Sequence, residues 1–344
     1  MGCPSIVNRL AFAFEPLFLA DEEMRPLLVP VVKATYAIGP RGKLALAEKQ
    51  VPPNLAGEYW GDPDTSSYRY EPECAFHKPA TDVALIGHAY APKAGVMEVT
   101  VSFRVGPVGK TVRVVGDRSW FKSLSAVTMS PPKPIERIPL VYERAFGGWD
   151  RSDPDPEKHD FEPRNPVGTG FRGKHGSFRE GTRVPNLEDP RHPIRDISDR
   201  PPPAGFGFTS PSWQHRVAFA GTYDEPWSKQ RMPLLPKDFD RRFFNAASPG
   251  LVAPGYLKGN EPVVVENASP EGKLGFHLPG VPPPACRVRL RGGNDHLLQT
   301  QLDTVIVDMD ERLLFLIWRA VLALRSGPQD VVSIEIGADS ASGR

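Results

Sequence analysis

Cysteine is scarce in this sequence, and the three residues present, Cys3, Cys74 and Cys286, are far apart. No two of them form the Cys-x-x-Cys pair that is typical of structural zinc sites and redox motifs. A disulfide framework needs paired cysteines in an oxidising compartment. We therefore expect a chain that folds without disulfides in a reducing compartment, the cytoplasm.

The sequence also has no excess of charge of one sign, because 42 Lys and Arg residues are balanced by 41 Asp and Glu residues. Proteins that bind nucleic acid through its phosphates carry a basic excess or stripe, so we expect no nucleic-acid partner. The most apolar stretch, residues 313–324, is interrupted by Arg319, whereas a membrane-spanning helix needs about 20 apolar residues. The first residues lack the basic start and apolar stretch of a secretory signal. We expect no membrane partner and a cytoplasmic location.

Proline and glycine, by contrast, are abundant: 39 Pro and 31 Gly make up roughly a fifth of the 344 residues, against about an eighth in average proteins. Proline removes a backbone donor and glycine loses much conformational freedom on folding, so this composition excludes long helices. Hydrophobic residues make up 40% of the chain, which is enough for a core. The length fits one large all-β domain or two smaller ones.

Alternation of apolar and polar residues predicts the strands. It runs through residues 97–105 and again through 112–114, with a Gly-Pro-Val-Gly turn between them, which predicts a hairpin. Residues 303–307 and 312–321 predict a second hairpin, and its return strand is apolar on both faces, as in a central buried strand. Further strands are predicted around residues 32–38, 286–290 and 332–336.

A single short helix is predicted, with Asp238 as its N-cap and Phe239, Phe243 and Ala247 at helical spacing. The expected fold class is mainly β: antiparallel β-sandwich or barrel-like sheets with long ordered irregular loops and few short helices. Gly147 and the glycine after it are interpreted as a required backbone bend.

The segment 151–215 differs from the rest, because periodicity disappears and single aromatic residues recur among Asp, Pro, Arg and Gly. A structureless loop of this length is uncommon inside a compact domain. Either the segment is an ordered excursion, pinned by its aromatics, in a single domain spanning 1–344, or it joins two β lobes, 1–150 and 216–344. The aromatics favour the pinned excursion, whose composition is that of interface hot spots.

Motifs for cofactors and metals fail on their context. Residues 168–174 fit Gly-x-Gly-x-x-Gly, but phosphate-binding loops need a strand before the glycines and a helix after them, and neither is predicted. We interpret this segment as an ordered turn. The eight histidines form no metal-binding pair, and residues 308–311 lack the glycine and distal Glu of a calcium loop. No cofactor and no metal ligand are therefore predicted.

Catalytic motifs are missing too, because neither Gly-x-Ser-x-Gly nor a catalytic cysteine signature occurs. Asp224 and Glu225 beside Trp227 could serve glycoside hydrolysis, but neighbouring residues of a strand point to opposite faces. No catalytic residue is predicted, and we expect that the protein is not an enzyme.

Several segments are specific enough to resemble a known family. Among them are VVKATY (31–36), GDRSW (116–120), VYERAFGG (141–148), AGTYD (220–224) and LPKDFD (235–240). In order and spacing they resemble a domain of initially unknown function found in bacteria beside type VI secretion genes. The resemblance runs from about residue 10 to about residue 320 and extends to segments at 46–50, 78–83, 87–92, 138–140, 165–168, 185–188 and 202–207.

This resemblance implies a cytosolic adaptor or chaperone without enzymatic activity. Such a protein binds a toxic effector, often one with a PAAR domain, and helps to load it onto the VgrG spike. The expected partners are thus the effector toxin, PAAR proteins and VgrG. Two alternatives stay open: a carbohydrate-active or other hydrolytic β-sandwich enzyme using scattered Asp and Glu residues, and a structural component of the secretion machine.

Six residues are candidates for contact with a partner, because Trp and Arg dominate interface hot spots. Each also has a structural interpretation. Arg118 would pair with Asp117 in a turn, the tryptophans and Tyr223 would pack in the core, and the strand arginines, with Arg291, would form a solvated face. The candidates are Arg118, Trp213, Arg216, Trp227, Arg287 and Arg289.

Overall fold

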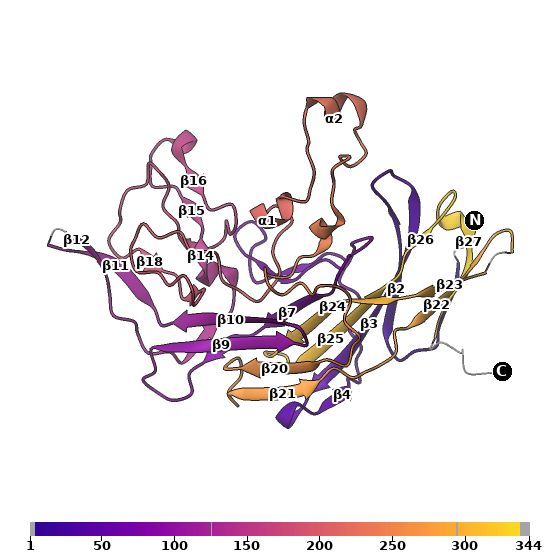
Figure 1. Ribbon diagram of the computed structural model, residues 1–344, viewed down its shortest axis with the longest axis horizontal. Coiled ribbons are helices and arrows are strands. Elements are labelled where there is room, and N and C mark those ends of the chain that lie inside the picture. Colours follow the sequence, from indigo (N-terminus) through magenta and orange to yellow (C-terminus); the bar gives the residue numbers. More distant parts are fainter. Residues whose placement is uncertain (1–3, 125, 294, 338–344) are drawn as a thin grey trace.

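The protein is built from β-sheets with short helices between them, as the computed structural model of residues 4–124, 126–293 and 295–337 shows (Figure 1). The predicted fold class, mainly β with sandwich-like sheets and few short helices, is confirmed. In the described part of the chain, no helix is long and apolar enough to cross a lipid bilayer.

A seven-stranded sheet lies at the centre of the fold. Its path runs β2-β3-β25-β24-β7, and β4 and β26 pair with β3 beside that path. β7 lies parallel to β24, and the other neighbours are antiparallel. The strands are β2 (Ala13–Ala20), β3 (Pro26–Ile38), β4 (Leu44–Leu46), β7 (Asp82–Ile86), β24 (Gln301–Asp308), β25 (Leu313–Arg319) and β26 (Leu322–Ala323).

Two further sheets complete the framework. A five-stranded antiparallel sheet has the order β19-β10-β9-β20-β21, and a four-stranded sheet has the order β1-β27-β22-β23. The first contains β19 (Leu187–Glu188), β10 (Val108–Val115), β9 (Glu98–Val105), β20 (Pro262–Glu266) and β21 (Lys273–His277). The second contains β1 (Ser5–Asn8), β27 (Val331–Gly337), β22 (Ala285–Leu290) and β23 (Asp295–Gln299).

Both faces of the central sheet are buried, because successive side chains of a strand point to opposite faces. On β25, Leu316 and Trp318 belong to a large core that also contains residues of the other two sheets, such as Val101 and Cys286. Phe315 lies on the opposite face, in a second core completed by aromatic and apolar residues outside the sheets. The predicted central strand, apolar on both faces, is confirmed.

Strands from distant parts of the chain pair with one another. β7 lies beside β24, and β9 pairs with both β10 and β20. The segments 1–150 and 216–344 therefore share sheets. Within 151–215, Phe206, Phe208 and Trp213 are buried, whereas Phe161 is exposed.

Small sheets extend the framework, and β11, β12, β14, β15, β16 and β18 lie at one end, on the left in Figure 1. The longest, β12-β11-β18, carries the projecting β11–β12 hairpin. Its strands are β11 (Arg118–Ser123), β12 (Ala126–Met129) and β18 (Arg183–Val184). The two-stranded pairs are β5 (Glu58–Tyr59) with β6 (Tyr68–Tyr70), β8 (His88–Tyr90) with β13 (Arg137–Pro139), β14 (Phe146–Gly147) with β17 (Thr169–Gly170), and β15 (Trp149–Asp150) with β16 (Asp160–Phe161).

The predicted helix is wrong in its position and type. The chain forms α1 (Gln214–Val217) and α2 (Glu225–Gln230), and the region of the prediction holds only a 3-10 turn, η4 (Arg241–Phe244), capped by Asp240. Phe239 and Phe243, which the prediction placed on one helix face, instead form a ring cluster with Phe244. The ring centroids of Phe239 and Phe244 are 5.7 Å apart. The other 3-10 turns are η1 (Pro40–Gly42), η2 (Tyr142–Arg144), η3 (Pro156–Lys158) and η5 (Pro328–Asp330).

The bend predicted at Gly147 and Gly148 is confirmed. Both residues have positive φ, 151° and 97°, a conformation that favours glycine. A Cβ on Gly147 would lie 2.1 Å from the carbonyl oxygen of Asn165. This close approach lets β14 pair with β17 and holds the irregular segment against the framework.

Candidate protein-binding surface

Arg118 is buried, and its predicted contact with a partner needs correction. Its guanidinium donates to Glu188 at 2.5 Å and to the carbonyl of Pro185 at 2.7 Å. Glu188 is itself buried and also pairs with Arg113 at 2.7 Å. The local Asp117–Arg118 pair is also wrong, since Asp117 instead pairs with other arginines. Arg118 ties β11 to β19 and presents no surface to a partner.

Trp213 and Arg216 are also buried, at 3% exposure each, and do not lie on the surface either. The Trp213 ring packs edge-on against Tyr142 at 5.0 Å between centroids, so its structural interpretation is confirmed. Arg216, on α1, pairs with Glu71 at 3.0 Å and donates to a backbone carbonyl, that of Phe243, at 2.9 Å. Its charge and donors are used inside the fold.

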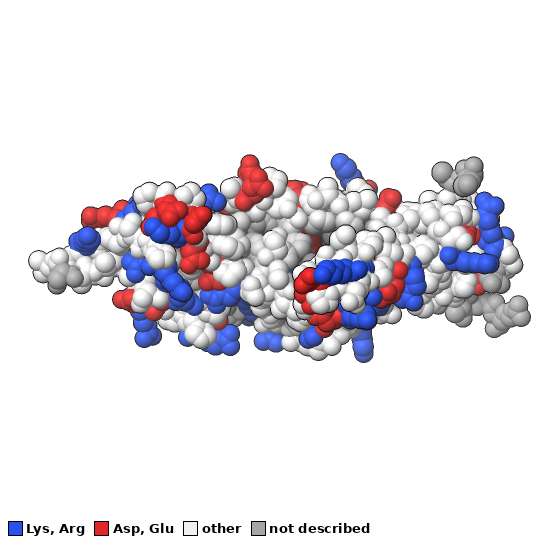
Figure 2. Space-filling model, turned by 90° about the horizontal axis from the view of Figure 1, so that it is seen from above, with Lys and Arg blue, Asp and Glu red and all other residues white. Residues whose placement is uncertain are grey.

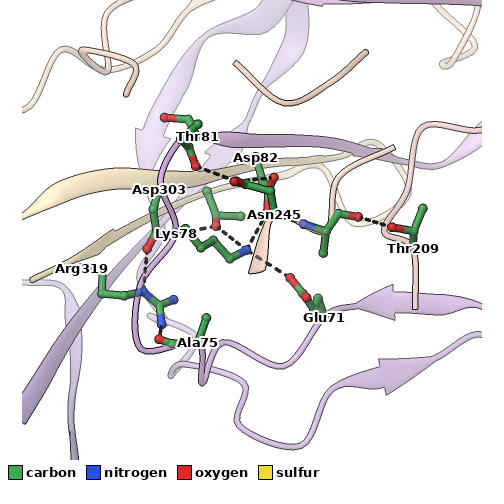
Figure 3. A network of polar contacts seen from close by, with 12 residues as sticks. Glu71, Ala75, Lys78, Thr81, Asp82, Thr209, Asn245, Asp303 and Arg319 are labelled. Carbon is green, nitrogen blue, oxygen red and sulfur yellow. Dashed lines mark hydrogen bonds and ion pairs between the residues drawn. The ribbon is translucent and has the colours of Figure 1, made fainter. Parts of the chain in front are cut away.

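Through Glu71, Arg216 joins α1 to a buried polar network of the central sheet. Figure 3 shows the part of this network around Lys78. Lys78 lies at its middle, 3.1 Å from Glu71 and 2.8 Å from Asp82. Burial opposes its charge, but the two carboxylates hold the pKa of Lys78 above its usual value. Asn245 donates to Asp82 at 3.0 Å. Because a buried charge is tolerated only when paired and hydrogen-bonded, the network serves the fold.

A second buried pair lies close by, between Arg319 of β25 and Asp303 of β24 at 2.6 Å (Figure 3). Arg319 also donates to the carbonyl of Ala75. A cavity of about 190 Å³ adjoins this pair and Lys78. Asp303 matches the charge of Arg319, although the Nη2 atom of Arg319 is buried and has no hydrogen-bond partner among the described residues.

Trp227 lies on a projecting arm, residues 218–240, that carries α2 away from the sheets (Figure 1). Its ring packs edge-on against Tyr223 at 4.7 Å, and its indole N–H donates to the carbonyl of Leu234 at 2.9 Å. Trp227 is half-buried, whereas Tyr223 and Met232 are 53% and 62% exposed. The arm therefore exposes the ring of Tyr223, which packs against Trp227, and the thioether of Met232. We call these two exposed side chains the aromatic patch of the arm.

Hydrogen bonds fix the neck of the arm. Asp238 accepts from the backbone N–H and the hydroxyl of Thr222, at 3.0 and 2.7 Å. Arg231, further along, pairs with Glu23 of the β2–β3 turn at 2.5 Å. Figure 2 looks down on the arm and shows basic and acidic side chains intermixed around it. No single sign of charge dominates this face, so an arm-bound partner would be recognised mainly through apolar contacts.

A groove of about 500 Å³ opens among the small sheets and contains Trp149, Arg151 and Arg179. Trp149, 46% exposed, stacks on Phe161 at 4.4 Å, and Arg151 lies over the Trp149 ring at 4.9 Å. Asp150 accepts the N–H groups of Ser152 and Gly173, which together with the charge of Arg179 hold the pKa of Asp150 below its usual range despite some burial. This carboxylate is a poor general acid.

The strand arginines lie on the exposed face of the four-stranded sheet. Arg287 and Arg289 of β22 are exposed, with buried residues between them, as predicted. Arg289 pairs with Asp295 of β23 at 3.1 Å, and Arg287 lies opposite Glu335 in the sheet register. The face is solvated and its charges are partly neutralised, so it offers a partner only mixed charge.

The acids considered for hydrolysis have local roles. Asp224 caps α2 by accepting the N–H of Trp227 at 2.8 Å, and Glu225 pairs with Lys229 on the helix surface. Within the ranges that the structure describes, no group of three His, Cys, Asp or Glu residues could hold a metal ion. Tyr223 was expected in the core and Met232, which precedes Pro233, was not among the candidates, yet both are exposed.

The fold and this surface define a mainly β protein that exposes an aromatic patch on a projecting arm and an arginine-lined groove. The chain belongs to a bacterial family described as "Uncharacterized protein conserved in bacteria (DUF2169)", whose model matches residues 23–319. A search of curated proteins and a search of solved structures each found no match.

Proposed function

We propose that this protein is an adaptor or chaperone that binds a toxic effector and helps to load it onto the VgrG spike of a type VI secretion system. The effector would often be one linked to a PAAR domain. The resemblance of segments along almost the whole chain supports this proposal. Membership of a family conserved in bacteria is compatible with it.

The observation that carries the proposal is the exposure of apolar side chains on the arm. Tyr223 and Met232 are exposed on a segment whose neck is closed by Thr222 and Asp238 and whose far side is tied to Glu23. Aromatic anchors held in place before binding lose little conformational entropy when a partner covers them. The groove at Trp149 supplies a second surface with an exposed aromatic ring, which in this case lies among arginine residues.

The experiment is co-expression of the tagged protein with the products of the neighbouring toxin, PAAR and VgrG genes, followed by purification. We expect a stable complex with one of them. The variant Tyr223→Ala/Met232→Ala should weaken that complex about 30-fold or more, because hot-spot truncations cost about 2 kcal/mol or more. Leu297→Ala is the matched control, since Leu297 is as exposed as Tyr223 but lies on the four-stranded sheet.

The outcomes separate the proposal from its alternatives. Elution of the protein free of every neighbouring product would contradict an adaptor role. Stoichiometric purification with baseplate subunits when no toxin is present would indicate a structural component of the machine. Turnover of a glycan or ester by the purified protein, lost when one Asp or Glu is replaced by its amide, would indicate an enzyme.

A further inference from the structure

A second cavity, larger than the groove at Trp149 at about 590 Å³, is lined by the half-buried side chain of Lys110. We call it the Lys110 pocket. It is lined by Lys110 of β10, Tyr142, His215 of α1, the Asp189–Arg191 turn and Pro203. Its volume falls in the range of pockets that enclose small ligands, about 300–1,000 Å³.

Lys110 has no carboxylate partner within ion-pair distance among the residues that the structure describes. Its ammonium donates to the hydroxyl of Ser248 at 2.6 Å and to the carbonyl of Pro249 at 3.1 Å. These two neutral acceptors leave one of its three N–H donors unused. Burial lowers the pKa of Lys110 to about 8, the effect expected of an ammonium that lacks a close counter-ion.

Asp189 is the carboxylate residue in the lining of the Lys110 pocket, and it pairs with Arg191. Arg191 donates to both of its oxygens, at 3.2 and 3.1 Å, and His192 lies 3.5 Å away. These contacts outweigh burial and lower the pKa of Asp189 to about 2. Asp189 therefore stays ionised at the rim and does not neutralise Lys110 directly.

His215 supplies a second polar group without a partner. Its Nε2 atom is buried and, among the described residues, has no hydrogen-bond partner. Burial, together with the charges of Arg216 and Lys110, lowers the pKa of His215 to about 4, so the ring is neutral near pH 7. A neutral imidazole protonated at Nε2 offers a donor that no described residue uses.

Ser248 is not placed to act as a nucleophile beside Lys110. It is fully buried, accepts from Lys110 and from the Tyr142 hydroxyl at 2.8 Å, and donates to the carbonyl of Gly205 at 2.8 Å. Its proton is used in that last bond. The pocket thus has the chemistry of a binding site, with one cation that lacks a carboxylate partner, one neutral donor and walls of proline and tyrosine.

We propose that the Lys110 pocket binds a single carboxylate group carried on a small apolar body. The free ammonium and the unpartnered imidazole are the donors that a carboxylate accepts, and the proline walls suit an aliphatic body. A doubly charged phosphate is disfavoured because Asp189 stands at the rim and only one lysine charge is free. The free C-terminus of a peptide and a free organic acid are the two sources of this chemistry.

The test uses the purified full chain and four probes observed by NMR titration. They are hexanoate, the acetylated tripeptide Ala-Ala-Leu with a free C-terminus, the same peptide as its C-terminal amide, and inorganic phosphate. We expect saturable binding of hexanoate or the peptide acid, and none of the amide. Lys110→Met should weaken binding about 10- to 100-fold, the loss of one charge-assisted hydrogen bond, whereas Lys93→Met, which removes an exposed lysine elsewhere, should leave it unchanged.

His215→Leu keeps the Lys110–Ser248 contact and provides a second variant if Lys110→Met does not fold. It should weaken binding several-fold. Binding of the peptide acid alone or of hexanoate alone identifies the source. Equal binding of acid and amide, tighter binding of phosphate, no binding of either carboxylate, or unchanged binding by both pocket variants would overturn the proposal. Because no second protein is present, these results are independent of the adaptor role.

Discussion

Replacing Arg216 by methionine tests whether this residue stabilises the fold or was kept for a partner. The guanidinium is 4% exposed and contacts Glu71 at 3.0 Å and the carbonyls of Thr209 and Phe243 at 2.8 and 2.9 Å. Methionine fills similar space but donates nothing. Glu71 would lose one of its two cations and keep Lys78 at 3.1 Å.

We expect Arg216→Met to lower the free energy of unfolding by about 3–5 kcal/mol. Breaking a buried ion pair on one side has this cost, and each buried carbonyl left without its donor adds about 1–3 kcal/mol before the structure relaxes. The retained Glu71–Lys78 pair keeps the total near the lower end. Urea unfolding followed by tryptophan fluorescence measures the change as a shift of the midpoint.

Arg289→Met is the matched control, because Arg289 also has a carboxylate partner, Asp295 at 3.1 Å, but both side chains are largely exposed. Its cost should not exceed about 1 kcal/mol. If the two variants unfold at the same urea concentration, the reasoning about the buried network is refuted. If Arg216→Met folds normally but loses an effector, the original assignment of Arg216 to an interface would be restored.

Two further changes test the fold in the same assay. Gly147→Ala should destabilise the protein by about 1–3 kcal/mol, because its φ is 151° and its new Cβ would meet the carbonyl of Asn165, whereas Gly207→Ala, with no atom within 4 Å of its Cβ, should change little. Asp189, with its pKa lowered to about 2, contributes stability that is present above pH 4 and lost as pH falls toward 2. Asp189→Asn should therefore show a smaller loss of stability over that range, and an identical acid profile would contradict the assignment.

Local patterns in the sequence were sufficient for the strands and hairpins. The alternation of residues 97–105 reappears as β9, and the doubly apolar stretch after residue 312 reappears as β25, buried on both faces. Such patterns succeed because a strand alternates its side chains whatever it pairs with. The helix prediction at Asp238 failed because Phe239 and Phe243, although at helical spacing, cluster with Phe244 around a 3-10 turn instead.

Burial of single arginines and tryptophans could not be derived in the same way. Arg118 and Arg289 each lie on a strand rich in polar residues, yet one is 6% exposed and pairs with Glu188 from far along the chain, while the other is solvated. Trp213 is core and Trp227 is half-exposed on the arm, although both stand in proline-rich surroundings. Glu188 and Tyr142, which contact Arg118 and Trp213, come from distant segments, whereas Arg289 and Trp227 have only local partners among the contacts described above.

The amino-acid sequence alone determined the class of fold, the two hairpins, the central buried strand and the glycine bend, since each depends on near neighbours and on backbone conformation. Only the tertiary structure determined which charged side chains lie next to one another. It brought Glu71, Lys78 and Arg216 into one network, left Lys110 without a counter-ion and lifted Tyr223 away from the sheets. Solvation and charge pairing depend on groups far apart in the chain, and these decide which side chains can bind.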